Sequence, residues 1–340
     1  MMTDAVEKGP VRIAILSFAH GHAHGYATCL AANPHAELVL IADDNVERGQ
    51  AASQLYGATW VADYREAVTR DDIDAVVICS ENVYHKVMTI AAAEAGKHVL
   101  CEKPIATTVA DARQMIEACA RHNVKLQIAF PVRFNATTIG LRDAVRAGRI
   151  GEPLIIAARN PGMCPHDWFV QPELSGGGAV IDHTVHVVDV LRWMFDTEVT
   201  EVYAEVDTRI YDIPTDDTGL LMMRLSNGIP VSLDTSWSRP ANNPIWGGVM
   251  IEIIGETGVL SLSAFNNNID LIEVQGPSNT RIPAEVTGDP EMVGAFIDAV
   301  RFNSDPTVTG VDGLRALEVA LAAYESAKTH EVVAIDHAAV

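Results

Sequence analysis

Short apolar runs alternate with longer, helix-like segments through the first 130 residues. The runs are almost continuously hydrophobic, which is typical of parallel strands that helices cover on both faces. Six strand–helix units at this spacing predict a doubly wound parallel sheet. The predicted strands cover residues 11–16, 36–43, 58–61, 74–80, 98–102 and 125–130.

After residue 150 the pattern changes to closely spaced strands. Helices are predicted at 179–195 and near 290–302 and 312–328. Turn residues such as SNG and GETG separate the strand-like runs, which indicates a largely antiparallel sheet. We therefore expect an α/β chain with a first domain over residues 1–130 and an α+β domain over 131–340. The strands predicted for the second domain are 201–210, 219–225, 230–237, 249–255 and 259–263.

The charge balance excludes several classes of partner. The chain has 24 basic and 45 acidic residues, a net charge of −21 with histidine neutral. Such a surface repels nucleic acids and anionic lipid, so we expect neither nucleic acid nor membrane as a partner. No apolar stretch approaches the ~18 residues of a spanning helix, and MMTDAVEKGP lacks the apolar segment of a signal peptide. Five scattered cysteines without a CxxC pair predict a reduced, cytoplasmic protein.

The loop SFAHGHAHGY (17–26) joins the first predicted strand to a helix, the setting in which a helix N-terminus binds a pyrophosphate. Its glycine fingerprint is incomplete, because only Gly21 and Gly25 are present. Asp43 ends the second predicted strand about 20 residues further on, where a carboxylate can accept hydrogen bonds from ribose hydroxyls. No adjacent base is available for a 2′-phosphate, which favours NAD over NADP. The alternative is that Asp43 starts a turn or caps the next helix.

Three histidines in the same loop suggest a metal site as a second possibility. His20, His22 and His24 could supply ligands in a binuclear metallohydrolase. Such hydrolases usually have eight strand–helix units, whereas this rhythm stops at six. We therefore expect no metal, with the histidines donating hydrogen bonds around a dinucleotide or lying on the surface.

The motif CEKP (101–104) places a lysine at the carboxyl end of the fifth predicted strand. Open α/β sheets bind their ligands at that edge, and Pro104 restricts the backbone just after Lys103. An ammonium directed into a cleft can polarise a hydroxyl or a carbonyl. Taken alone, a Glu-Lys pair at a strand end is more often a surface pair, but this position favours a functional lysine.

The predicted helix 179–195 carries polar residues on an otherwise apolar surface. Asp182, His186 and Asp189 have the spacing i, i+4, i+7 and so share one stripe. Such groups must be satisfied by hydrogen bonds or serve a function. The preceding SGGG (175–178) lets backbone approach a ligand closely, which favours an acid–base pair of Asp182 and His186. His183 lies on a neighbouring stripe and is the weaker candidate.

Taken together, these motifs resemble the glucose–fructose oxidoreductase, inositol dehydrogenase and rhizopine-catabolism family (Gfo/Idh/MocA) over nearly the whole chain. The resemblance implies an N-terminal Rossmann domain and a C-terminal α+β domain with a large open sheet, whose face commonly forms a homodimer or homotetramer. It also implies hydride transfer between NAD or NADP and a sugar, polyol or related secondary alcohol. The segments that carry it are the block from 74 to 126 around EKP, 132–153, 176–195, GETGVLSLS and the closing GVDGLRALEVALAAYESAK.

By this resemblance, Lys103, Asp182 and His186 match the catalytic trio. Arg133 matches a frequent substrate-side arginine, and His183 is a second candidate for contact with substrate. The cofactor contacts implied are Phe18, Ala19, His20, Gly21, Asp43, Ser80, Asn82, His85, Glu102 and Lys103.

Two departures from the family pattern are the glycine-poor loop, which retains Gly21 and His24, and Thr184 in place of a glycine. The first affects the pose of the pyrophosphate and the second the shape of the substrate pocket. Two further functions stay open from the sequence. One is a redox-neutral glycosidase or epimerase that uses bound NAD transiently, and the other is a non-catalytic NAD-binding sensor.

Overall fold

The computed structural model describes residues 9–264, 268–273, 279–283 and 288–337, whose contacts divide into two compact units. The first unit holds the described residues up to Glu102 together with Arg113–Ala129 and Asp289–Gly310. The second holds the remaining described residues, including Lys103–Ala112. The chain therefore passes between the units more than once, and one passage follows residue 129, beside the boundary expected at 130.

The first unit contains a six-stranded sheet in the order β3-β2-β1-β4-β5-β6, with every neighbouring pair parallel. The doubly wound parallel sheet predicted from the apolar runs is confirmed. Strand order reverses between β1 and β4, which is where such sheets bind ligands at their carboxyl ends. The strands are β1 Val11–Leu16, β2 Ala36–Ala42, β3 Thr59–Val61, β4 Ala75–Ile78, β5 His98–Cys101 and β6 Leu126–Ile128.

Helices fill the connections of this sheet, and α9 joins them from far along the chain, packing against α1. The strands are short and strongly apolar because helices cover both faces, and β4 buries all of its side chains. The helices are α1 His22–Ala32, α2 Val46–Tyr56, α3 Tyr64–Val68, α4 His85–Glu94 (after a 3₁₀ turn at Asn82–Tyr84), α5 Val109–Arg121 and α9 Asp289–Phe302.

The second unit is built on one sheet of nine described strands, in the order β14-β13-β12-β11-β7-β10-β9-β8-β15. Of the described pairs only β7 and β10 run parallel, so the mostly antiparallel sheet is confirmed. The strands are β7 Pro153–Arg159, β8 Val199–Asp207, β9 Thr218–Leu225, β10 Pro230–Asp234, β11 Met250–Gly255, β12 Gly258–Ser263, β13 Asn268–Glu273, β14 Asn279–Pro283 and β15 Val333–Ala334.

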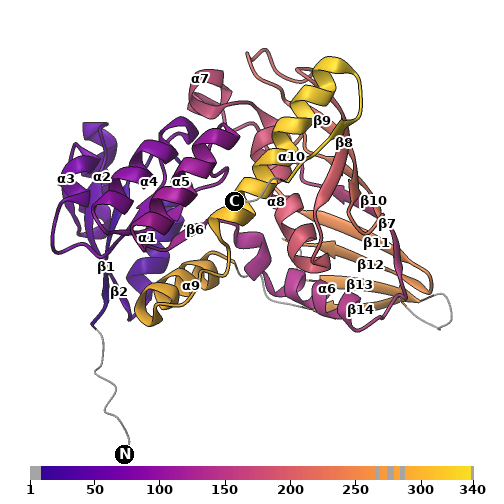
Figure 1. Cartoon of the computed structure of the whole chain (residues 1–340), viewed down its shortest axis with the longest axis horizontal. Coiled ribbons are helices and arrows are strands. Elements are labelled where there is room, and N and C mark those ends of the chain that lie inside the picture. Colours follow the sequence, from indigo (N-terminus) through magenta and orange to yellow (C-terminus); the bar gives the residue numbers. More distant parts are fainter. Residues whose placement is uncertain (1–8, 265–267, 274–278, 284–287, 338–340) are drawn as a thin grey trace, which may run out of the picture. The chain divides into compact units, whose positions relative to one another are not determined.

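Helices cover one face of this sheet and leave the other open (Figure 1). In β9 buried and exposed residues alternate, so that Leu221 and Met223 face the helices while Leu220 and Met222 are about half exposed. The helices of the unit are α6 Ala136–Arg146, α7 Pro172–Ser175, α8 Ala179–Phe195 and α10 Gly310–Thr329, with 3₁₀ turns at Pro131–Phe134 and Asp167–Val170.

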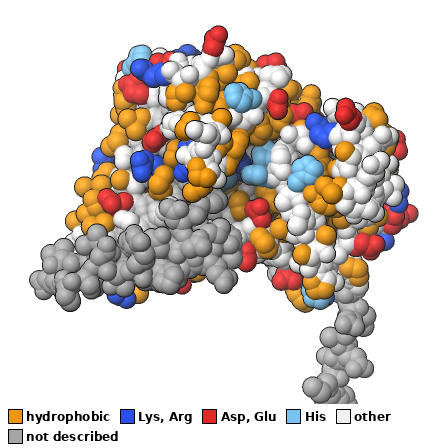
Figure 2. All heavy atoms as spheres, turned by 180° about the vertical axis from the view of Figure 1, so that it is seen from behind, with side chains coloured by type: hydrophobic (Ala, Val, Ile, Leu, Met, Phe, Trp, Pro, Cys, Tyr) orange, Lys and Arg blue, Asp and Glu red, His pale blue; other side chains and the backbone are white. Residues whose placement is uncertain are grey.

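Figure 2 shows how charged and apolar side chains are distributed over one face of the described residues. There, basic side chains are interspersed with acidic and apolar ones rather than gathered in one broad area. Among the described residues, none of the helices is both long and apolar enough to cross a membrane.

Candidate functional site

The loop after β1 lies where strand order reverses. Ser17 has a positive φ of 71°, and the His20 amide donates to the Cys79 carbonyl at the end of β4 (2.9 Å). Helix α1 then begins at His22, and its N-cap Gly21 has no side chain to satisfy the first N–H groups. A Cβ on Gly21 would meet no heavy atom of the described residues within 4 Å. The amides of His22 and Ala23 already donate to His20 Nδ1 and to the His20 carbonyl (both 3.1 Å), so the binding of a pyrophosphate at this helix N-terminus stays a prediction.

Asp43 lies just beyond β2, as predicted, and its carboxylate is fully buried. Its Oδ2 accepts hydrogen bonds from the Phe18 amide (2.7 Å) and Arg48 Nε (2.8 Å). Its Oδ1 accepts from the Asn45 amide (2.9 Å) and Arg48 Nη2 (2.8 Å). The expectation that no base lies beside Asp43 is therefore wrong, because one turn of α2 brings Arg48 back onto it.

The segment after β4 supplies three more of the predicted cofactor residues. Ser80 and His85 are fully buried, and His85 Nε2 lies 3.3 Å from the Ser80 carbonyl. Asn82 is also buried and opens the 3₁₀ turn before α4. All three thus lie at the carboxyl end of β4, on the edge of the sheet where the loop after β1 ends.

A group of potential metal ligands lies in the same unit. Atoms of His20, His22 and Glu102 that could bind a metal lie within 4.8 Å of one another. Glu102 Oε1 already accepts a hydrogen bond from Tyr26 (2.5 Å) and lies 3.0 Å from His22 Nδ1. The His22 amide donates to His20 Nδ1 (3.1 Å), which in a neutral ring puts the proton on Nε2. That nitrogen could bind a metal only after losing its proton, so the arrangement favours a hydrogen-bond network, and the absence of metal stays a prediction.

In the second unit, Lys103 forms a buried ion pair with Asp182 near the start of α8. The second oxygen of Asp182 accepts from Trp237 Nε1 (3.3 Å) and lies 3.3 Å from His183 Nε2. Burial raises the pKa of Asp182, but the charge and the hydrogen bond of the Lys103 ammonium act in the other direction, and the pKa lies below the ordinary value. Asp182 is therefore a carboxylate held in one orientation by three side chains.

The two histidines of α8 differ in their surroundings. The His183 ring is 9% exposed and lies beneath Gly162, where a Cβ would come within 2.6 Å of it. Burial lowers the pKa of His183 more than Asp182 raises it, so this imidazole stays neutral. His186 is only partly buried and contacts Phe130 edge-to-face, with 5.9 Å between ring centres. His186 follows Asp182 by four residues in α8, so both lie on one side of the helix, as the i, i+4 spacing predicts.

The glycines before α8 approach protein rather than ligand. A Cβ on Gly178 would lie 1.9 Å from the Asp216 carbonyl oxygen, and one on Gly177 would lie 2.3 Å from the Tyr324 hydroxyl. The Asp216 carboxylate accepts from the amides of Gly178 and Val180 (both 2.8 Å) and from the Tyr324 hydroxyl (2.8 Å). The sequence interpretation of SGGG as space for a ligand missed this cap, which fixes the first turn of α8 and so the position of Asp182.

Comparison with known proteins gives the family of the chain. Residues 13–130 match the oxidoreductase family with an NAD-binding Rossmann fold, and residues 139–261 match the GFO/IDH/MocA C-terminal domain. The myo-inositol 2-dehydrogenase of Thermotoga maritima is 30% identical over 81% of this chain and 83% of its own. The chain belongs to the GFO/IDH/MocA family. The family model describes it as an oxidoreductase with an NAD-binding Rossmann fold.

Two other relatives agree with this membership. The 1,5-anhydro-D-fructose reductase of Ensifer adhaerens is 29% identical over 88% of this chain and 91% of its own. The dehydrogenase WlbA of Bordetella pertussis, solved with NADH and UDP-GlcNAcA, has a TM-score of 0.84 and 26% identity over 96% of this chain and 99% of that one.

Arg133 and Thr184, two positions of this GFO/IDH/MocA protein that the resemblance relates to the substrate, are both buried. Arg133 is 5% exposed and pairs through Nε and Nη2 with Asp189 (2.7 and 2.6 Å) and through Nη2 with Asp312 (2.9 Å). Thr184, which replaces the usual glycine, is fully buried. A substrate contact for Arg133 and a change of pocket shape by Thr184 both stay predictions.

Proposed function

We propose that this protein transfers a hydride between NAD and a secondary alcohol of a sugar, polyol or inositol-like substrate. The observation that carries the proposal is the buried Lys103–Asp182 pair, with His186 one helical turn away, in a chain that also has a Rossmann sheet. Bound NAD supplies the hydride acceptor, and the side chains handle the proton and the developing charge.

The roles follow from the chemistry of each group. His186 takes the hydroxyl proton as general base, because it is the partly accessible imidazole of α8. Lys103 donates a hydrogen bond to the same oxygen and stabilises the negative charge that develops there. Asp182, an acceptor already held by Trp237, orients Lys103 and His186 toward that oxygen. Gly162 lies against the His183 ring, so this ring is poorly accessible to a substrate.

The proposal is tested by measuring NADH formation on a panel of cyclic and open-chain polyols, inositols, monosaccharides and anhydrosugars. We expect one NADH per molecule of ketone or lactone formed, with nothing formed when NAD is omitted. Product without net NADH would contradict the proposal in favour of the redox-neutral glycosidase or epimerase. Binding of NAD with no turnover on the whole panel would favour the sensor.

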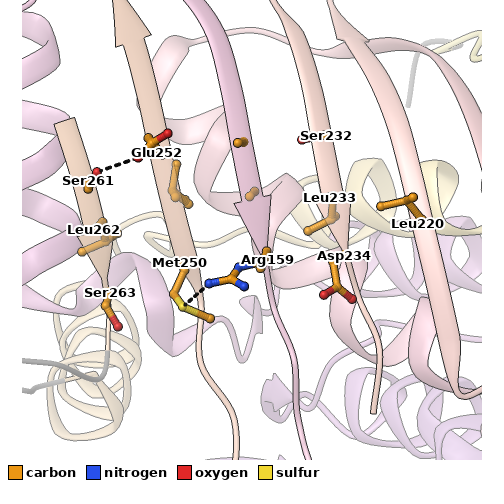
Figure 3. A pocket seen from close by; sticks show the side chains of 13 residues that line it. Arg159, Leu220, Ser232, Leu233, Asp234, Met250, Glu252, Ser261, Leu262 and Ser263 are labelled. Carbon is orange, nitrogen blue, oxygen red and sulfur yellow. Dashed lines mark hydrogen bonds between the residues drawn. The ribbon is translucent and has the colours of Figure 1, made fainter. Parts of the chain in front are cut away.

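We also propose that a second copy of the chain covers the open face of the nine-stranded sheet. Side chains from five neighbouring strands, β9, β10, β7, β11 and β12, line a hollow of about 720 Å³ on this face (Figure 3). Leu220, Met222 and Ile155 are each about half exposed there. Such apolar positions on an open sheet are typical of an interface between proteins. The five cysteines of the chain form no disulfide. Because disulfides are rare in the reducing cytoplasm, we assign the homodimer or homotetramer to that compartment.

Light scattering after size-exclusion chromatography tests this interface. We expect a dimer or tetramer for the unmodified protein and a monomer for Leu220→Lys/Met222→Lys, because two charges would be buried without partners. Leu55→Lys on α2, where the leucine is 67% exposed, is the matched control and should keep the assembly. An unmodified protein that is monomeric at all concentrations would contradict this proposal and leave the dehydrogenase proposal intact.

A further inference from the structure

His166 and Asp167, in the segment between β7 and α7, have positive φ angles of 56° and 48°. With a ψ of −151°, His166 adopts a backbone conformation that is easy for glycine and strained for an L side chain. Of the other described non-glycine residues with a positive φ, Ser17 lies in the loop after β1 and four follow the end of a helix, where such a residue is common. These four are Asn123, Asp196, Asn303 and His330. No helix of the described residues ends at His166, so helix capping does not account for its strain.

A short series of contacts leads from His166 to the Lys103–Asp182 pair. Cys164 Sγ lies 3.6 Å from His166 Nδ1. Cys164 in turn packs in one buried cluster with Trp237, whose Nε1 donates to Asp182 (3.3 Å). His166 is exposed, and among the described residues its ring has no other hydrogen-bond partner. The imidazole is therefore separated from Asp182 by a thiol and an indole, and its Nε2 can still form a hydrogen bond with a ligand.

A second loop holds an aromatic ring against this imidazole. Tyr211 contacts His166 edge-to-face, with 5.8 Å between ring centres, and packs against the cluster of Trp237. The loop is fixed by Asp217, whose carboxylate accepts hydrogen bonds from the three consecutive amides of residues 209–211 (2.7 to 2.8 Å). A sugar or cyclitol has C–H groups that pack on an aromatic ring and hydroxyls that both donate and accept hydrogen bonds. An imidazole beside a tyrosine ring suits such a ligand.

We infer that His166 binds the substrate through a hydroxyl distant from the oxidised carbinol, with Tyr211 packing on the ring that carries this hydroxyl. The inference deepens the proposed function and rests on it. Strained backbone persists only where the surrounding structure imposes it, and it is concentrated at ligand sites. Because a thiol and an indole separate the imidazole from Asp182, its contact lies beyond the reacting carbon. It therefore strengthens substrate binding equally before and during the chemical step.

Steady-state kinetics of the whole protein test the inference on the cyclic compound that it oxidises fastest among myo-inositol, 1,5-anhydro-D-glucitol and D-glucose. His166→Ala should raise KM by about 3- to 10-fold, the range for one neutral hydrogen bond, and change kcat by less than about twofold. Single-deoxy analogues of the same compound then identify the hydroxyl. One analogue should have a raised KM with the unmodified protein and no further rise with His166→Ala.

A glycine variant separates the side chain from the backbone strain. His166→Gly should raise KM as much as His166→Ala, but its Tm should be higher than that of the alanine variant, because glycine adopts this backbone without strain. His330, an exposed histidine with a φ of 57° after α10, is the matched control. His330→Gly should also have a higher Tm than His330→Ala, but neither variant should change KM or kcat.

The inference is overturned if KM rises by less than threefold in both His166 variants while the cyclic compound is still oxidised, and the dehydrogenase proposal then stands. A loss confined to kcat would also overturn it, because the side chain would then act on the chemical step. So would deoxy analogues that lose equally with the unmodified protein and with His166→Ala. If the unmodified protein oxidises no compound of the panel, the proposed function is contradicted and this inference with it.

Discussion

Replacing His186 with glutamine should lower kcat by about 10²- to 10⁴-fold, the range for loss of a general base. The substitution removes the partly accessible imidazole of α8 and keeps a polar side chain of similar length. NAD binding should be unchanged, since all of the proposed dinucleotide contacts except Lys103 lie in the other unit. Single-turnover NADH formation, together with titration of NAD by protein fluorescence, measures the two effects separately.

His183→Gln is the matched control for this experiment. His183 Nε2 lies 3.3 Å from the Asp182 carboxylate and could be taken for the base on this distance alone. Its ring is buried under Gly162 and its pKa is lowered by that burial, so it is poorly placed to exchange a proton with substrate. We expect a loss below tenfold. A larger loss in His183→Gln than in His186→Gln would assign the base to His183 instead.

The parts of the fold that the sequence predicted are those set by local pattern. Strands β1 to β6 are continuous apolar runs because helices cover both faces, and all six fall within the predicted ranges. In the second unit, β7, β13, β14 and β15 were not predicted. β7 reads PLIIAAR, which has no clear alternation, and it pairs in parallel with β10, some 70 residues later.

In the candidate site, too, the residues with a local sequence pattern were predicted and those brought in from distant parts of the chain were not. The spacing of Asp182 and His186 was sufficient to place them on one stripe of α8, and CEKP was sufficient to single out Lys103. The groups that hold these residues are distant in sequence. Trp237 donates to Asp182, and Asp216 with Tyr324 caps the helix. Tertiary folding alone brings these groups together, so no local spacing predicts them. Arg48 is an exception, since its place three residues after the N-cap Asn45 could have suggested a contact back to Asp43.

Lys103→Met should affect both turnover and stability, because Lys103 has a second role as the partner of Asp182. Loss of a hydrogen-bond donor to a developing oxyanion lowers kcat by about 10²- to 10³-fold. Removing one partner of a buried ion pair also destabilises a protein by about 3–5 kcal/mol, since the other charge is left uncompensated. Activity per folded molecule and thermal unfolding must therefore be measured together.

The double variant Lys103→Met/Asp182→Asn separates the two roles. Asparagine is neutral and can still accept from Trp237, so most of the lost stability should return, while kcat should stay at least 10²-fold low. A double variant that turns over at nearly the unmodified rate would contradict the catalytic role of Lys103. One that stays as unstable as Lys103→Met would show that the buried charge is not the cause.

The pH dependence of Lys103→Met gives an independent test with a definite sign. In the unmodified protein the pKa of Asp182 is lower in the folded state than in the unfolded chain. The ion pair therefore stabilises the fold at pH values above the unfolded-state pKa, and this stabilisation is lost as the pH falls through the folded-state pKa. Without Lys103, burial raises the pKa of Asp182, and the folded state binds a proton more readily than the unfolded chain. The difference in Tm between the two proteins should therefore be largest at pH 7 and should narrow toward pH 4. A difference that stays constant over this interval would mean that packing, rather than charge, sets the stability of the pair.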